Sequence, residues 1–278
     1  MFEFSFFVWN IHGMNGYGDY LTPSFVIDRI LFEERDIVII TEFIRTKDWD
    51  EISSKLSSKY WRYTYDKKCG TNEILILVRK NFCGISDENL RKIPKYNFSA
   101  NYGQPNFLQV IININDKSKL FIIGLRITDT NNHIAEFEAL SRHFQSLKLG
   151  EDDYVICAGD FNEWHRLVQN KIPQSFKVHT PRFNLGSNPF PNTSAKDSTI
   201  STWSAVLKDP KTGVTGKALI DHVVTNNIPS VELEDYCWDF VNTQNGYGNL
   251  TAVDILSNAL YHPDHAILKG KACLSSLK

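Results

Sequence analysis

The stretch YVICAGDFN, from Tyr154 to Asn162, gives the strongest indication of fold in this sequence. Its first five residues form an apolar run that is typical of a buried strand. Gly159 favours a turn, so Asp160 and Asn162 are expected just past the strand end. Side chains two residues apart on an extended chain point the same way, and an acid beside an amide suits holding a water or a phosphate oxygen. Taken alone, the same residues are equally well explained as an ordinary loop.

Four further segments place polar residues on or at the ends of predicted strands. Each is explained on its own as a turn cap or a polar surface dipeptide. Their joint occurrence, in this order and each tied to a strand, favours a shared functional site. The segments are FSFFVWN (Phe4–Asn10), which ends in Asn10; DIVIITE (Asp36–Glu42), which ends in Glu42; ALIDHVV (Ala218–Val224), which contains Asp221; and HPDHAIL (His262–Leu268), which opens with an acid and a histidine, Asp264 and His265.

With these motifs the chain resembles the endonuclease/exonuclease/phosphatase superfamily, which includes exonuclease III, pancreatic-type deoxyribonuclease, deadenylases, neutral sphingomyelinases and inositol polyphosphate 5-phosphatases. The resemblance covers nearly the whole chain, from Phe4 to Leu268. It implies a deoxyribonuclease I-like α/β fold, a four-layer sandwich of two packed mixed β-sheets flanked by helices. The motifs that carry it are Trp9-Asn10, Thr41-Glu42, Gly159-Asp160-Phe161-Asn162, Thr202-Trp203, Ile220-Asp221-His222 and Pro263-Asp264-His265.

The resemblance further implies a Mg2+-dependent phosphodiesterase, with Mn2+ as a substitute ion. Glu42, with Asn10, would hold the metal, and Asp264 would be an added ligand or a supporting acid. Magnesium prefers oxygen ligands and keeps several waters, so one or two carboxylates and an amide suffice to bind it.

The catalytic residues that the resemblance implies lie in the second half of the chain. Asp160 would orient or deprotonate the attacking water, and Asn162 would hydrogen-bond that water or a phosphate oxygen. His265 would contact the scissile phosphate, with Asp221 orienting its ring. Whether Asp160 or His265 is the general base stays open.

The chain departs from the family pattern at several positions. Pro263 stands where Ser is common, and Thr41-Glu42 lacks the preceding Gln, but neither change removes a catalytic atom. His12 stands where abasic-site enzymes carry an acid, so it either alters the support of the metal or touches the phosphate. Arg126 stands where the family more often has His or Tyr, and we predict that its guanidinium replaces their phosphate contact. A salt bridge at a strand end is the alternative for Arg126. Asn72 and Trp203 are further candidate substrate contacts.

The composition bounds these expectations. A chain of 278 residues with 42% hydrophobic residues is expected to form a single domain over residues 1–278. Its formal net charge of -2 excludes binding of nucleic acid by bulk charge, so any polyanion site must be local. Five cysteines without a CxxC pair suit neither a disulfide framework nor a zinc site. No apolar run is long enough to span a bilayer, and a cytoplasmic location is the expectation.

Strands and helices alternate along the predicted fold. Helices are predicted for Ser24–Glu34 and Asp48–Ser58, and the spacing of Ile134, Phe137, Leu140, Phe144 and Leu147 predicts a long amphipathic helix. A surface loop or insertion is expected at 173–201, which is rich in Pro, Asn, Ser and Thr. Paired strands are predicted for Tyr60–Tyr65 with Glu73–Val78, and for Phe107–Ile114 with Leu120–Ile127.

A nuclease acting on DNA or RNA is therefore the expected function. The alternatives are a phosphomonoesterase or phospholipase of the same superfamily, acting on inositol phosphates or sphingomyelin, and a binding module that keeps the fold without turnover. Lipid-directed members carry an exposed apolar hairpin or a membrane segment, neither of which is visible in the sequence. A decayed enzyme is expected to have lost one of the principal polar residues, yet all five remain: Glu42, Asp160, Asn162, Asp264 and His265.

Overall fold

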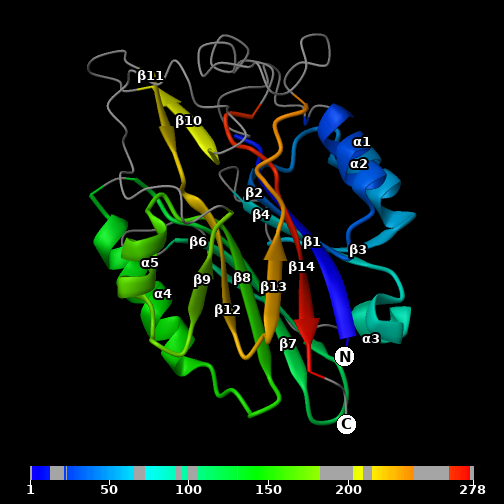
Figure 1. The fold of residues 1–278 in the computed structure, drawn as a ribbon. Helices are drawn as coiled ribbons and strands as arrows, with labels where there is room; N and C mark the ends of the chain where they lie inside the picture. The colour runs from blue at the N-terminus through cyan, green and yellow to red at the C-terminus, as the bar shows by residue number, and fades with distance from the viewer. Residues whose placement is uncertain are drawn as a thin grey trace.

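The computed structural model describes residues 2–12, 22, 24–65, 73–91, 95–98, 105–129, 131–181, 203–208, 215–240 and 263–275. Two six-stranded sheets lie face to face at the centre of this part of the chain (Figure 1). The first sheet has the order β13 (Ser230–Leu233), β14 (Leu268–Leu274), β1 (Phe2–Asn10), β2 (Ile37–Phe43), β4 (Glu73–Arg79) and β3 (Tyr60–Tyr63). The second has the order β5 (Lys95–Phe98), β6 (Asn106–Asn113), β7 (Lys119–Arg126), β8 (Tyr154–Asp160), β12 (Asp221–Asn226) and β9 (Lys177–His179).

The two sheets share one plan. Each contains one parallel pair, β1 with β2 and β7 with β8, and the other neighbours are antiparallel. A parallel pair needs a crossover connection, and helices α1 and α4 lie in these two connections. The strands of each parallel pair therefore end at the same edge of their sheet. The helices are α1 (Ser24–Glu33), α2 (Trp49–Ser57), α3 (Asp87–Arg91), α4 (His133–Ser146) and α5 (His165–Lys171), and a two-stranded hairpin is formed by β10 (Ala205–Lys208) and β11 (Thr215–Ala218).

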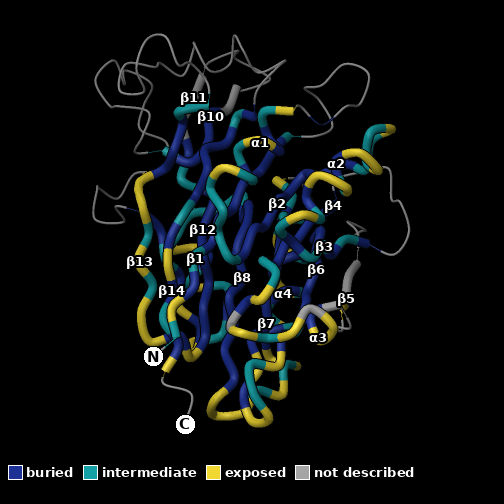
Figure 2. Tube along the Cα trace, turned by 90° about the vertical axis from the view of Figure 1, so that its right-hand side faces the viewer, coloured by how far each residue is buried: buried dark blue, intermediate teal, exposed yellow. Residues whose placement is uncertain are grey.

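Side-chain alternation builds three apolar layers. On β8, Ile156 and Ala158 face the other sheet, whereas Val155 and Cys157 pack under α4 and α5. The same alternation on β1 sends Val8 between the sheets and Trp9 towards α1. Buried residues therefore fill both faces of the central strands. Figure 2 shows these strands buried along most of their length. The predicted four-layer α/β sandwich is confirmed, and so is the buried strand that precedes Asp160.

Two predicted strands have different limits. The run Ala218–Val224 is not one strand, because β11 ends at Ala218 and β12 begins at Asp221. Between them Ser204 Oγ accepts hydrogen bonds from the backbone N–H groups of Ile220 at 2.8 Å and of Asp221 at 3.2 Å, which takes these donors out of a strand ladder. The run His262–Leu268 does not open a strand either, since β14 begins at Leu268.

Part of the predicted loop at 173–201 is a strand instead. Residues 177–179 form β9, which pairs with β12 at the edge of the second sheet. Phe176 and Val178 are buried in the core, and the Phe176 ring stacks on Phe144 of α4 at 4.3 Å. Local composition missed this strand because pairing with a distant partner decides it. Residues 182–201 lie outside the described part of the chain.

The amphipathic helix is confirmed as α4, with one correction. Phe137, Leu140 and Phe144 are buried as predicted, but Ile134 is 68% exposed. Glu136 takes a buried place in the first turn instead, because its carboxylate accepts bonds from the N–H and hydroxyl of Thr128. None of the helices in the described ranges has the length and apolar character needed to cross a bilayer.

Candidate active site

Three strands deliver polar side chains to the space between the sheets. Asn10, Arg126 and Asp160 each continue the series of even-numbered positions that faces the other sheet, and each is the last residue of its strand. The register pairs Arg126 directly with Asp160. Asn10 bridges the two sheets, since its Nδ2 donates to Asp160 Oδ2 at 3.1 Å.

Glu42 reaches the same place through a break in alternation. Ile40 and Phe43 both lie in the core under α1 and α2, and their register partners on β4, Leu75 and Glu73, show that β2 carries one extra residue here. Glu42 occupies this bulge with φ 51, and Glu42 Oε1 accepts a hydrogen bond from Asn10 Nδ2 at 3.2 Å. A bulge re-aims one side chain, which here brings Glu42 to the inter-sheet face.

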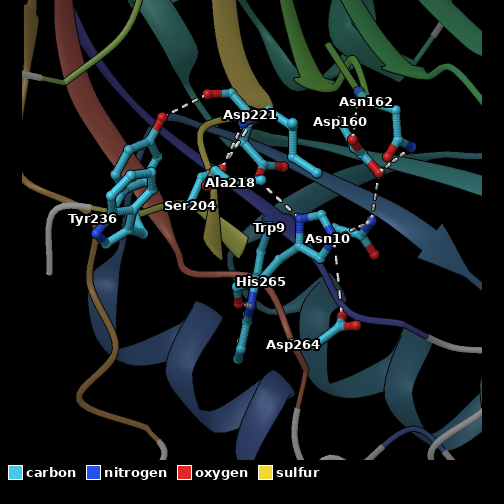
Figure 3. A network of polar contacts seen from close by, with 12 residues as sticks. Trp9, Asn10, Asp160, Asn162, Ser204, Ala218, Asp221, Tyr236, Asp264 and His265 are labelled. Atoms are coloured by element: carbon cyan, nitrogen blue, oxygen red, sulfur yellow. Dashed lines mark hydrogen bonds and ion pairs between the residues drawn. The ribbon is translucent and has the colours of Figure 1, made fainter. Parts of the chain in front are cut away.

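The turn after β8 holds the Asp160 carboxylate from three donors. Asp160 Oδ1 accepts from Asn162 N at 2.8 Å, and Asp160 Oδ2 accepts from Asn162 Nδ2 at 3.0 Å and from Asn10 Nδ2 (Figure 3). Asn162 has φ 47, and its Nδ2 also donates to Ile127 O at 2.7 Å. The acid and the amide therefore lie side by side because Asn162 turns back in a left-handed conformation, not because the strand continues.

His265 lies opposite this turn and pairs with Asp221. His265 Nδ1 donates to Asp221 Oδ2 at 2.9 Å, and the backbone O of His265 accepts from Trp9 Nε1 at 3.0 Å (Figure 3). These contacts fix the position of the ring. His265 Nε2 then lies 3.5 Å from Asn10 Nδ2 and 3.9 Å from Asp264 Oδ1.

Burial and neighbouring charges shift the pKa values of Asp160 and His265 in directions that suit proton transfer. Burial raises the pKa of the Asp160 carboxyl above its ordinary value, and this outweighs the opposing effects of His265 and Arg126. Burial on its own lowers the pKa of His265, but Asp221, followed by Asp160 and Asp264, outweighs it and raises that pKa. The site therefore favours a protonated imidazole beside a carboxyl group that accepts protons more readily than an ordinary aspartate.

Asp264 pairs with His12. Asp264 Oδ1 lies 3.1 Å from His12 Nδ1, and His12 N donates to Asn10 Oδ1 at 3.0 Å. Burial raises the pKa of Asp264, but the hydrogen bond to His12 and the charge of His265 outweigh it, so the net shift is downwards. The hydrogen bond to Asp264 in turn raises the pKa of His12. His12 is thus tied to the candidate metal ligand Asp264 as well as to Asn10.

Arg126 contacts carboxylates in this structure. Arg126 Nε donates to Glu42 Oε1 at 2.6 Å and lies 4.0 Å from Asp160 Oδ2. The salt bridge considered for Arg126 is therefore present, and the predicted phosphate contact stays a prediction.

Two residues that the sequence did not single out support Asp221. The backbone of Asp221 is held by Ser204 Oγ on its N–H and by Tyr236, whose hydroxyl donates to Asp221 O at 2.7 Å. Ser204 directly follows the Thr202-Trp203 motif, which is the signal that identifies it in hindsight, whereas Tyr236 has no local signal. Trp203 is half-buried, and its backbone O accepts from Trp238 Nε1 at 2.9 Å. Asn72 lies outside the described residues.

Three of the site residues form a group of potential metal ligands. Among the described residues, one potential ligand atom each from Asp160, Asp221 and His265 lie within 4.8 Å of one another. The hydrogen bond between His265 and Asp221 makes two of these atoms close, so an ion at this point would have to displace a proton. The positively charged guanidinium of Arg126 lies between the carboxylates of Glu42 and Asp160.

Solved structures of other proteins have the same architecture. Truncated TDP2 from Caenorhabditis elegans aligns with a TM-score of 0.65 and 18% identity over 99% of this chain and 98% of that chain. TDP2 from D. rerio, complexed with a single strand DNA product, aligns with a TM-score of 0.61 and 16% identity over 98% and 99%. ANGEL2, a 2',3'-cyclic phosphatase in complex with adenosine-2',3'-vanadate, gives 0.59 and 12% over 98% and 96%.

The chain therefore shares the fold of these solved structures at low sequence identity. No family model and no curated protein matches the sequence. The fold that the motif resemblance implies is therefore confirmed.

His222 belongs to a separate network on the other side of the second sheet. Its neighbour Asp221 faces the site, so strand alternation turns His222 towards α5 and β9. His222 Nε2 donates to Glu163 O at 2.7 Å, which leaves Nδ1 to accept from Thr180 Oγ1 at 2.7 Å. Thr180 Oγ1 then accepts from His165 Nδ1 at 2.9 Å. This chain of bonds anchors the peptide that follows Asn162.

The neutral state of His222 makes stability depend on pH. Burial lowers the pKa of His222 from its ordinary value of 6.5 to about 3. As the pH falls below 6.5 the unfolded chain takes up a proton that the folded chain refuses, so stability is lost from pH 6.5 downwards. The expected loss from His222 is about 2 kcal/mol between pH 7 and pH 5. We expect His222→Gln to remove this part of the pH dependence in urea unfolding experiments, and equal slopes for the two proteins would contradict the assignment.

Proposed function

We propose that this protein is a Mg2+-dependent phosphodiesterase that hydrolyses DNA or RNA. One observation carries the proposal: Asp160 of β8, Asp221 of β12 and His265, from the segment before β14, converge on one position. The combination supplies a proton acceptor and a proton donor with pKa values shifted in useful directions.

A phosphodiester resists attack because its anionic oxygens repel a nucleophile. The transition state gathers further negative charge, so the site needs a cation, a held water and a donor for the leaving oxygen. Glu42 and Asp264, with Asn10, are the proposed holders of Mg2+, which when bound would supply positive charge next to the phosphate. Asn10 Oδ1 accepts one hydrogen bond, from His12 N, and its second lone pair is the one that would ligate the ion.

Proton transfer then falls to two residues. Asp160 is the proposed acceptor of the water proton, since its pKa is raised and three N–H donors fix its orientation. His265 is the proposed donor, because Asp221 keeps Nδ1 protonated and stabilises the imidazolium form. Asn162 is placed next to Asp160 to hold the same water or a phosphate oxygen. Among the two candidates for the general base, this division favours Asp160.

The comparisons support a nucleic-acid substrate. The D. rerio TDP2 structure holds a single strand DNA product, and ANGEL2 holds an adenosine derivative. The net charge of -2 leaves recognition of a polyanion to local groups, and Arg126, His12 and His265 are basic side chains at the described site.

The test is turnover with and without metal. The purified protein is incubated with supercoiled plasmid, single-stranded DNA, RNA, a nucleoside 2',3'-cyclic phosphate and a soluble phosphomonoester, each with Mg2+, with Mn2+ and with EDTA. We expect cleavage of at least one polymer with Mg2+ or Mn2+ and complete loss of that cleavage with EDTA.

Other patterns would point elsewhere. Phosphate release from the monoester without cleavage of any polymer would replace the nuclease with a phosphatase. Cleavage that persists in EDTA would exclude the metal dependence. No turnover of any substrate would favour a binding module on the same fold.

A further inference from the structure

The carboxylate that is proposed as the main metal ligand is already paired with a basic side chain. Arg126 Nε lies 2.6 Å from Glu42 Oε1, and the two side chains are only 17% and 9% exposed. The same oxygen of Glu42 accepts from Asn10 Nδ2 at 3.2 Å. This oxygen therefore carries two donors, one of which is a full positive charge.

The β-sheet fixes the backbone position of Arg126, and its side chain is mostly buried. Arg126 is the last residue of β7 and is paired with Asp160 in the register with β8. Its guanidinium stays charged at every pH at which the protein is folded. The attraction of Glu42 and Asp160 keeps the guanidinium in the space between the sheets.

A divalent ion bound to Glu42 would lie close to the positive charge of the Arg126 guanidinium. Two cations that share one carboxylate repel each other strongly in a partly buried site. The ion therefore binds either after the guanidinium has moved off Glu42 Oε1 or at the cost of repulsion from it. In both cases Arg126 weakens metal binding.

We propose that Arg126 is an internal cation that occupies the metal-binding side of Glu42 and competes with the divalent ion for it. Arg126 is thus a positioning residue that sets the metal affinity of the site. In the metal-free protein its guanidinium stays paired with Glu42, and the ion has to replace it there. This inference rests on the proposed metal-dependent function. It goes beyond that function because it assigns the strength of metal binding to a single residue.

The experiment measures metal binding directly and needs no substrate. Mn2+ and Mg2+ are titrated by isothermal calorimetry into the wild type, Arg126→Gln and Arg126→Lys. Glutamine removes the charge but keeps a hydrogen-bond donor for Glu42, and lysine keeps the charge. We expect Arg126→Gln to bind Mn2+ more tightly by about tenfold or more, and Arg126→Lys to stay within a few-fold of the wild type.

A matched control lies at the other end of β2. Arg35 pairs with Glu33 at 3.2 Å, and the two side chains are 16% and 9% exposed, nearly the same as Arg126 and Glu42. Arg35→Gln is therefore expected to lose an ion pair of similar burial without changing the dissociation constant for Mn2+. A saturating concentration of Mg2+ is also expected to raise the melting temperature of Arg126→Gln more than that of the wild type or of Arg35→Gln.

The outcomes separate the two proposals. Binding to folded Arg126→Gln that is equal to or weaker than binding to the wild type overturns the role of Arg126 and leaves the metal-dependent function standing. Absence of binding in the wild type and in every variant overturns both. If Arg126→Gln does not fold, Arg126→Met, which is also uncharged and adds no basic group, gives the same comparison.

Discussion

Asp160→Asn is expected to lower turnover on the best polymer substrate by about three orders of magnitude or more. Asparagine keeps the size of the side chain but has no carboxylate to accept a proton. Its NH2 group would also face the N–H donors that now bond Asp160, which are Asn162 N, Asn162 Nδ2 and Asn10 Nδ2. The measurement is kcat under saturating Mg2+ with the substrate that the wild type cleaves fastest.

The same strand offers a control for this variant. Asp153 is a buried aspartate just before β8, and its carboxylate accepts from Lys119 N and Gly150 N at 2.8 Å each. Asp153→Asn is expected to cost stability while keeping turnover near that of the wild type. Turnover of Asp160→Asn that is equal to that of Asp153→Asn would remove Asp160 from the chemistry.

Gly159→Ala is expected to destabilise the fold by more than about 3 kcal/mol. Gly159 has φ +147, and a Cβ atom there would lie 2.0 Å from Leu125 O, the backbone of the neighbouring strand β7. That carbonyl cannot move far, because β7 is paired on both sides. The free energy of unfolding in urea measures the effect.

Gly84→Ala separates crowding from backbone strain. Gly84 also has positive φ, at +72, but no atom lies within 4 Å of a Cβ built on it. Its substitution is expected to cost only about 1–2 kcal/mol, which is the strain of the left-handed conformation itself. A cost for Gly159→Ala as small as that for Gly84→Ala would show that the β7 backbone yields, and would contradict the close packing at the base of the site.

Periodicity was sufficient where local pattern and fold agree. The apolar run before Gly159 became β8, the alternation on β1 and β8 placed Asn10 and Asp160 on one inter-sheet face, and the helical spacing gave α4. These features depend on near neighbours in the chain, so the sequence predicts them. Ile134 was the error on α4, because burial at the first turn was decided by a hydrogen bond from Thr128 to Glu136.

Contacts between distant residues decided the rest. Alternation along β2 would send Glu42 towards the helices with Ile40, and only the bulge against β4 turns it to the site. The pairing of Arg126 with Glu42 joins residues from different sheets, so no spacing in the sequence indicates it.

The residue types and their order along the chain thus determined the fold class and the set of polar side chains that meet between the sheets. Tertiary structure alone determined how those side chains pair with one another. The reason is physical: strand alternation is a local property of the backbone, whereas a bulge, a supporting serine such as Ser204 or an ion pair between sheets exists only when remote segments are packed together.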